Sequence, residues 1–185
     1  MTGQSHHAFK KEGVVYLPAA RLEQGLVPGL SLAEHFILSE GGGGFFIDRR
    51  AATALAEERI SAYNIKGTPG STVESLSGGN QQRMLLALLR TPLSLILLEH
   101  PTRGLDIEST IYIWSLLKQR CAQGTSIVFV SADLDEVLEY SDRVLVFFAG
   151  RVSPPLPADS LSVAELGELI GGKGWERFGR EALHA

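Results

Sequence analysis

The sequence predicts an α/β fold in which a mostly helical insert precedes a parallel β-sheet. From residue 93 onward, apolar runs with the length of buried strands alternate with amphipathic helical segments. Residues 31–92 contain helical patterns and no comparable strand. Because a strand–helix–strand connection is right-handed in nearly all proteins, the later part should form a right-handed parallel layer. We therefore divide the chain into residues 1–30, 31–92 and 93–185.

Composition limits the kinds of function that this chain can have. Its 185 residues, 44% hydrophobic and 21% charged, suit one globular domain. A net charge of −4 without blocks of like charge gives no general attraction to nucleic acid, which we do not expect as a partner. No apolar run is long enough to cross a bilayer, so a membrane role would act through a partner. The single cysteine, Cys121, excludes an internal disulfide and is expected to be buried on a helix.

The amino-terminal half is predicted to hold one strand, a loop and a series of helices. Residues 1–12 are polar and should be a flexible start, whereas residues 13–17 have the β-branched and aromatic side chains of a strand. Residues 18–30, with prolines and glycines, should form a loop. Helices are expected over residues 31–39, 48–62 and 77–90, the first with the spacing of a capping box at Ser31 and Glu34.

The carboxy-terminal half is predicted to alternate strands and helices. Strands are expected over residues 93–98, 126–130 and 143–148, and helices over residues 107–122 and 133–140. Gly150 should turn the chain, and Ser162 and Glu165 have the spacing of a capping box for a last helix. The glycines at 41–44 lack a following Gly-Lys-Ser/Thr, so we interpret them as a loop and not as a phosphate-binding segment.

The most informative stretch is residues 76–83, Leu-Ser-Gly-Gly-Asn-Gln-Gln-Arg. Ser77, Gly78 and Gly79 stand where a helix should begin, so backbone N–H groups and the positive end of the helix dipole face outward. The glycines allow an anion to approach the backbone closely, and the serine adds a hydroxyl donor. A serine cap followed by glycines is common by itself, but the full stretch is specific. It predicts a phosphate-binding helix start.

These residues resemble the signature motif of the ATPase domains of ATP-binding-cassette (ABC) transporters, in the form typical of monosaccharide and nucleoside importers. Residues 95–106, Leu-Ile-Leu-Leu-Glu-His-Pro-Thr-Arg-Gly-Leu-Asp, are similar to the Walker B strand and D-loop of that family. Residues 130–146 resemble its switch segment and following strand, and residues 15–26 its Q-loop region in the second cassette of sugar importers. The resemblance covers about residues 13–172 and implies a partial P-loop-NTPase-like (RecA-like) parallel sheet with a helical signature subdomain over residues 31–92.

The sequence departs from the family at the positions that hold and hydrolyse ATP. It contains no Gly-x-x-x-x-Gly-Lys-Ser/Thr, the loop whose amides and lysine hold the phosphates. Glu99 stands where the family has a magnesium-organising aspartate, and it could still hold magnesium weakly. His100 replaces the water-polarising glutamate and is either a substitute base or inert. Ala132 replaces the switch histidine and Ala19 the Q-loop side chain, so neither can form the expected hydrogen bond.

The resemblance implies that this chain acts on ATP held by another protein domain. In the family, ATP lies between the Walker A loop of one cassette and the signature of the opposite cassette. Contacts to that ATP would come from Ser77, Gly78, Gly79 and Asn80, and the partner cassette would supply the ATP and Mg²⁺. Asp106 would make a contact across the two cassettes, or would only cap the helix that follows it. The isolated chain is expected to be inactive as an ATPase.

The resemblance further implies a transmembrane permease subunit as a second partner, which would dock on residues 31–92. The chain would then lie in the cytoplasm, peripheral on the inner face of the cell membrane. Two other interpretations stay open: a non-catalytic scaffold or regulatory module with the same fold, or a truncated fragment of a tandem ABC ATPase. Changes at Ser77 and Gly78 should be silent in the scaffold and harmful in the signature role.

Overall fold

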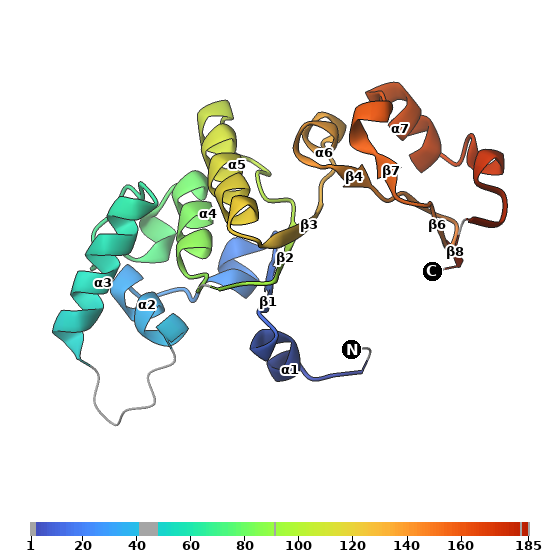
Figure 1. Ribbon diagram of the computed structural model, residues 1–185. Coiled ribbons are helices and arrows are strands. Elements are labelled where there is room, and N and C mark those ends of the chain that lie inside the picture. The colour runs from blue at the N-terminus through green and yellow to red at the C-terminus, as the bar shows by residue number, and fades with distance from the viewer. Residues whose placement is uncertain (1–2, 41–47, 91, 182, 185) are drawn as a thin grey trace. The chain divides into compact units, whose positions relative to one another are not determined.

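The computed structural model describes residues 3–40, 48–90, 92–181 and 183–184. The chain forms two compact units, residues 1–129 and 130–185 (Figure 1). Each unit has its own set of buried apolar side chains.

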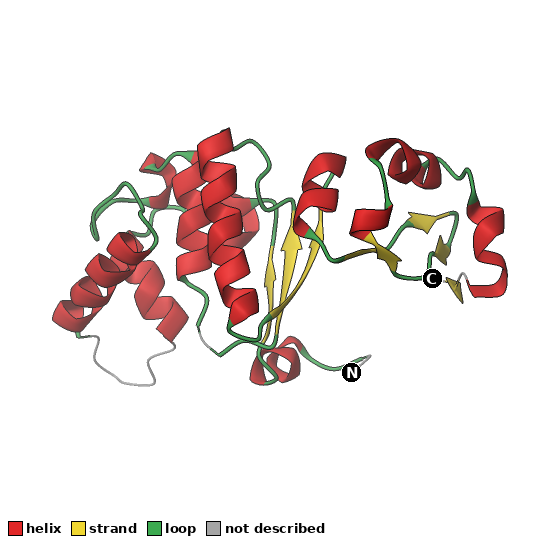
Figure 2. Cartoon of the chain, turned by 45° about the horizontal axis from the view of Figure 1, so that its top comes forward, coloured by secondary structure: helices red, strands yellow, loops and turns green. Residues whose placement is uncertain are grey.

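The first unit is built on a three-stranded sheet. Its strands are β1 (Val14–Leu17), β2 (Leu95–Glu99) and β3 (Ser126–Val130), with β2 in the middle. β1 runs parallel to β2, and Figure 2 shows all three arrows pointing the same way. The predicted α/β fold with a parallel sheet is confirmed, and each of these strands lies within two residues of its predicted range.

Helices cover one face of this sheet, and the alternation of burial along the strands follows from that. Ile96 and Leu98 are buried on the covered face. The ring of Phe129 in β3 packs edge-on against Trp114, with ring centroids 4.8 Å apart. The other face differs, because Tyr16 is 49% exposed and Val128 is 53% exposed. The sheet therefore presents apolar side chains to solvent.

The predicted helices of the first unit are confirmed. They are α2 (Leu32–Glu40), α3 (Arg49–Ala62), α4 (Gly78–Ala87) and α5 (Ile107–Ala122). Asp48 caps α3 through the amides of Arg50 and Ala51. The capping box at the start of α2 is present, since Ser31 N donates to Glu34 Oε2 and Glu34 N donates to Ser31 Oγ. The glycine run at 41–44 lies outside the described residues.

Helix α4 is the centre of the first unit. Every residue from Asn80 to Ala87 is buried, so the helix has no solvent-facing side after its first turn. It contacts α3, α5 and the turn that follows β1, and Figure 1 shows it between α3 and α5. Its apolar side chains share the core with Leu32, Phe36, Ile96, Ile113 and Leu117. The position of the α4 start is therefore set by close packing along the rest of the helix.

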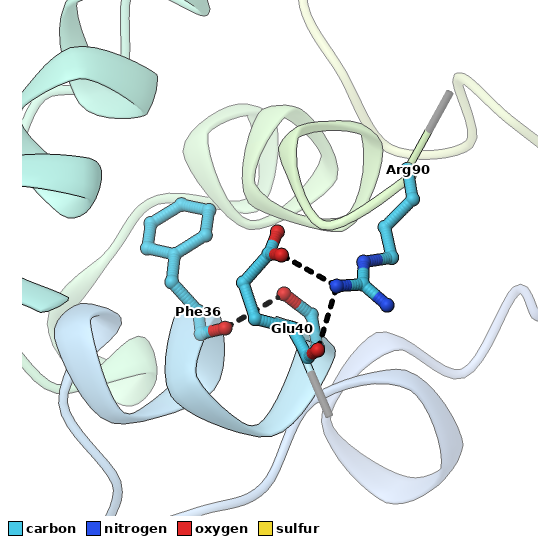
Figure 3. Close-up of polar contacts among 4 residues, drawn as sticks. Phe36, Glu40 and Arg90 are labelled. Carbon is cyan, nitrogen blue, oxygen red and sulfur yellow. Dashed lines mark hydrogen bonds and ion pairs between the residues drawn. The ribbon is translucent and has the colours of Figure 1, made fainter. Parts of the chain in front are cut away.

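The far end of α4 is connected to α2 and α5 by arginines. Arg90 Nη2 donates to the backbone carbonyl of Glu40 at 2.6 Å and also to its carboxylate (Figure 3). This hydrogen bond from Arg90 lowers the pKa of Glu40. Arg120 Nη2 of α5 donates to the carbonyls of Leu86 and Leu89. The helix dipole favours cations at this end of α4.

The second unit is a small α/β structure with antiparallel pairing. It contains α6 (Leu134–Tyr140), β4 (Arg143–Val144), β5 (Phe147–Phe148), β6 (Arg151–Val152), β7 (Leu156–Pro157), α7 (Val163–Ile170) and β8 (Leu183–His184). β4 pairs with β7, and β6 pairs with β5 and β8. Trp175, Leu166 and Leu169 lie in its core. The capping box of Ser162 and Glu165 is present at the start of α7.

The prediction of one continuous strand over 143–148 in the parallel layer is wrong. The segment forms β4 and β5, which belong to different antiparallel sheets. β5 turns into β6 through Ala149 and Gly150, both with positive φ, as in a tight hairpin. Pro154 and Pro155 then follow, and because proline has no N–H they interrupt the ladder before β7. The interrupted partner strand divides the segment in two.

Three local predictions are also wrong. The polar start contains a helix, α1 (His6–Lys11), because Ser5 caps it and Lys10 and Lys11 occupy its last turn. The predicted loop after β1 contains a π-helical turn, Arg21–Gly25. Cys121 is exposed and not buried, since it lies on the outer side of α5. None of the described helices is long and apolar enough to span a membrane.

The open face of the sheet predicts self-association of this chain in isolation. β1 and β3 are edge strands, and apolar side chains beside an open edge favour pairing with another chain. Val128→Lys should reduce the association measured by multi-angle light scattering, because it places a charge on the exposed face. Val163→Lys, which changes an exposed valine of α7, should not. A monodisperse monomer of the unchanged chain would contradict this prediction.

Candidate phosphate-binding site at the start of helix α4

Ser77 begins the candidate site as the N-cap of α4. Its backbone is extended, and its Oγ accepts from the Asn80 amide at 3.5 Å and from Asn80 Nδ2 at 2.8 Å. Both interactions use the oxygen as acceptor, so the hydroxyl hydrogen is left to donate outward. The amides of Gly78 and Gly79 have no hydrogen-bond partner within the described part of the chain. The start of α4 thus presents donors alone, which suits an anion.

Asn80 fixes the geometry of this turn. Its Oδ1 accepts from the backbone N–H of Lys66 at 2.8 Å. Because that N–H can only donate, the amide orientation is determined, and Nδ2 must face Ser77. Asn80 is buried, so both of its polar ends need these partners. Its role in the structure is to hold the cap, with its side chain turned inward.

The two glutamines that follow connect the start of α4 to neighbouring segments. Gln81 Nε2 donates to the carbonyls of Val73 and Leu76, at 3.1 and 3.2 Å. Gln82 Oε1 accepts from Arg21 Nε at 2.7 Å, and Arg21 Nη2 donates to the Arg103 carbonyl at 2.6 Å. The segments before and beside the helix start are therefore held by buried amide side chains.

The glycines are required by the space around them. A Cβ on Gly79 would lie 2.9 Å from Ser109 Oγ and 3.4 Å from Ser109 Cβ. A Cβ on Gly78 would lie 3.4 Å from Arg21 Nη1. Helix α5 and the turn after β1 therefore approach the backbone of α4 closely. A side chain at either position would therefore crowd these neighbours.

A buried arginine joins α4 to α5. Arg83 is 7% exposed, donates from Nη1 to the Asn64 carbonyl at 2.7 Å, and lies over the Tyr112 ring at 4.3 Å. Its Nε has no hydrogen-bond partner among the residues that the structure describes. The carbonyl and the aromatic face stabilise this buried cation.

Asp106 caps α5 beside the site. Its Oδ1 accepts from the Ser109 amide at 2.8 Å and its Oδ2 from the Ser109 hydroxyl at 3.1 Å. Hydrogen bonds from the amide and then the hydroxyl of Ser109 lower the pKa of Asp106. The capping role that the sequence left open is therefore present, and a contact across two cassettes remains a prediction.

Glu99 and His100 lie at the carboxyl end of β2. Glu99 is exposed, and a hydrogen bond with its carboxylate is the main cause that raises the pKa of Tyr16. His100 follows with φ of 44°, an unusual backbone for a residue other than glycine. Ala19 lies in the loop after β1, and Ala132 lies in the second unit. Within the described residues, no three His, Cys, Asp or Glu side chains gather closely enough to hold a metal ion.

Comparisons with known proteins give the family context of this site. No protein-family model matches the chain. The xylose import ATP-binding protein XylG of Photobacterium profundum is 36% identical over 174 residues, which are 90% of this chain and 34% of that protein. The ribose import ATP-binding protein RbsA of Hahella chejuensis is 34% identical over 162 residues, 84% of this chain and 32% of that protein. The chain is a homologue of sugar-import ATP-binding proteins.

Solved structures of low sequence identity show the same fold. An ABC transporter in an inward-facing conformation matches with a TM-score of 0.68 at 18% identity, covering 86% of this chain and 64% of that one. CbiO1 of Clostridium perfringens, part of the ABC transporter complex CbiONQ, matches with a TM-score of 0.66 at 21% identity, covering 96% and 70%. This homologue therefore has the fold of ABC ATPases. It spans about a third of the length of its curated relatives.

The residues of this chain that the sequence suggested for Mg²⁺ fit that ion poorly. Glu99 is a single exposed carboxylate that shares a hydrogen bond with Tyr16. The donors at the start of α4 suit a phosphate, not a cation.

Sequence reasoning missed Arg21 and the inward roles of Gln81 and Gln82. Arg21 stands two positions after Ala19, which has no hydrogen-bonding side chain. It contacts Gln82, 61 positions away. No local periodicity marks such a contact. The one available signal was a charged residue close to the strand end in a segment resembling the Q-loop region.

The close approach at Gly79 predicts an unusual stability effect. Gly→Ala in a helix normally stabilises a protein by about 0.5–1 kcal/mol, but Gly79→Ala should destabilise this one by roughly 1–3 kcal/mol, because Ser109 must move. Urea unfolding measures the change. Ser109→Ala should reduce the penalty, since it removes the nearest atom. Gly70→Ala, with open space around it, is the control and should be neutral or stabilising. Equal changes in stability for Gly79→Ala and Gly70→Ala would contradict the close packing around Gly79.

Proposed function

We propose that this chain is an ATP-binding component of a sugar- or nucleoside-type ABC importer that supplies its signature to ATP held by a partner cassette. The observation that carries the proposal is the start of α4, where Ser77 and the amides of Gly78 and Gly79 present donors that no other described residue accepts. A phosphate placed there would accept these donors directly. The homologues' names support ATP binding in sugar import.

In this proposal the partner cassette supplies the phosphate-binding loop, since residues 1–185 contain no Gly-x-x-x-x-Gly-Lys-Ser/Thr. A helix start facing phosphate contributes about 0.3–2 kcal/mol, and hydrogen bonds to charged groups add about 1.5–3 kcal/mol each. These energies suffice to stabilise a closed dimer around ATP. They do not replace a lysine and a magnesium shell, which the partner would supply with the ATP and Mg²⁺.

The hydrolytic positions support a site that is degenerate in this chain. Ala19 and Ala132 have no hydrogen-bonding side chain, and His100 cannot supply the negative charge of a glutamate. Hydrolysis would then occur in the site whose Walker A, magnesium ligands and catalytic base belong to the partner. The isolated chain would not hydrolyse ATP.

One further partner and a location follow from this proposal. A transmembrane permease subunit would contact the helical part, residues 31–92. Closure of the two cassettes would then move that subunit. The chain would lie in the cytoplasm on the inner face of the membrane. The competing function, a scaffold that uses the same fold without nucleotide, predicts partner binding that ignores ATP.

A fluorescent-ATP titration tests the proposal. The full chain is measured alone and then mixed with a Walker-A-bearing cassette made unable to hydrolyse ATP. No binding by the chain alone and tighter retention in the mixture are expected. Magnesium-dependent binding by the isolated chain would contradict the degenerate site, and no added retention in the mixture would contradict the signature role.

Gly78→Asp provides the specific variant. It should abolish the added retention, because the new carboxylate would stand beside Arg21 where a phosphate would bind. Gly70→Asp adds the same charge on the same part of the chain, in open space, and should retain ATP as the unchanged chain does. Full retention with Gly78→Asp would overturn the proposal.

A further inference from the structure

We propose that Arg21 is a positioning residue of the signature: it connects the start of α4 to the turn before α5 and holds both against the bound phosphate. The inference rests on the proposed function. Its starting point is the geometry of one guanidinium group that contacts two segments and faces a third. Arg21 begins the π-helical turn after β1, in a segment whose neighbouring Ala19 has no polar side chain.

The first connection is to α4. Arg21 Nε donates to Gln82 Oε1 at 2.7 Å, and Gln82 is 3% exposed. A buried amide oxygen that loses its donor is costly, so this bond fixes the side chain of Arg21 relative to the helix. The bond lies one helical turn after Gly78, on the side of α4 that faces the turn after β1.

The second connection is to the turn between β2 and α5. Arg21 Nη2 donates to the carbonyl of Arg103 at 2.6 Å. This turn continues through Leu105 to Asp106, the cap of α5, and Leu105 also lies near Gly78. One planar group therefore fixes the distance between the helix start and the segment that resembles the D-loop. A guanidinium can form both bonds at once, whereas a lysine ammonium lacks this fork.

The third nitrogen faces the proposed phosphate site. Nη1 lies 3.4 Å from the position of a Cβ on Gly78, and it has no hydrogen-bond partner in the described part of the chain. The described residues place no carboxylate in an ion pair with Arg21. Its charge also lies at the start of α4, where the helix dipole disfavours a cation.

These charges favour an anion in front of α4. Burial lowers the pKa of Arg21, and the charge of Arg103 lowers it further, because two guanidinium groups repel each other. A phosphate would reduce both the repulsion and the unfavourable interaction with the helix dipole. The other end of α4 gives the contrast, since Arg90 and Arg120 lie there in the favourable orientation.

The experiment measures the apparent Kd for fluorescent ATP in the mixture of the full chain with the hydrolysis-dead Walker-A cassette. Arg21→Met should weaken retention about tenfold or more, the scale of a lost hydrogen bond to a charged group. Arg21→Lys should not restore it, because the ammonium cannot make both connections. Gln82→Leu should also weaken retention. Its effect should not add to that of Arg21→Met, because both changes remove the same hydrogen bond between residues 21 and 82.

Arg90→Met is the matched control. It also removes an arginine that hydrogen-bonds across helices at α4, but at the far end (Figure 3). Its retention of ATP should equal that of the unchanged chain. Urea midpoints of all variants show whether a loss of retention reflects unfolding.

Each outcome decides a separate point. Retention by the unchanged chain with no loss in Arg21→Met overturns the inference and leaves the proposed function intact. Recovery in Arg21→Lys would assign the effect to charge and overturn the positioning role. Absence of retention by the unchanged chain removes the proposed function, and the inference with it.

Discussion

The complete burial of α4 is the constraint on which the rest of the first unit depends. From Asn80 to Ala87 the helix contacts protein on every side, so its neighbours must meet both apolar and polar groups at close range. Three of its polar side chains have hydrogen-bond partners. Asn80, Gln81 and Gln82 receive or donate hydrogen bonds from three different segments. These contacts fix where the helix begins relative to its neighbours.

Charge is distributed unequally between the two ends of α4. The far end has arginines that the helix dipole favours, and one of them makes the contact to Glu40. The start has Arg21 beside it, and the nearby carboxylate of Asp106 accepts from Ser109. A protein optimised only for stability would place a carboxylate at the helix start. The arrangement found here leaves the start ready for an anion, at the cost of some stability.

Local capping chemistry explains why most helices could be predicted from the sequence. Asp48, Ser77 and Asp106 each accept from an amide of the first turn, and these residues are recognisable without a structure. Strands depend on distant partners. The segment 143–148 has the composition of one strand, but prolines on the opposite segment divide it. A pattern within six residues contains no information on that partner.

The candidate site likewise combines features that the local sequence predicts with contacts that depend on distant residues. The order of Ser77, Gly78 and Gly79 indicates a phosphate-binding helix start, and the structure has the donors in that arrangement. The inward orientation of Asn80 and the contact of Arg21 with Gln82 depend on residues 14 and 61 positions away. Such contacts follow from the packing of α4 and not from local spacing.

Hydrogen exchange over residues 77–81 tests directly whether the start of α4 binds ATP that a partner cassette holds. The chain is measured alone, with ATP, and with ATP plus the hydrolysis-dead Walker-A cassette. The amides of Gly78 and Gly79 have no hydrogen-bond partner among the described residues, so they should exchange rapidly until a phosphate accepts them. Protection of these amides is expected only when ATP and the cassette are both present. Unchanged exchange there, or protection that appears at Glu99 and His100 in the chain alone, would contradict it.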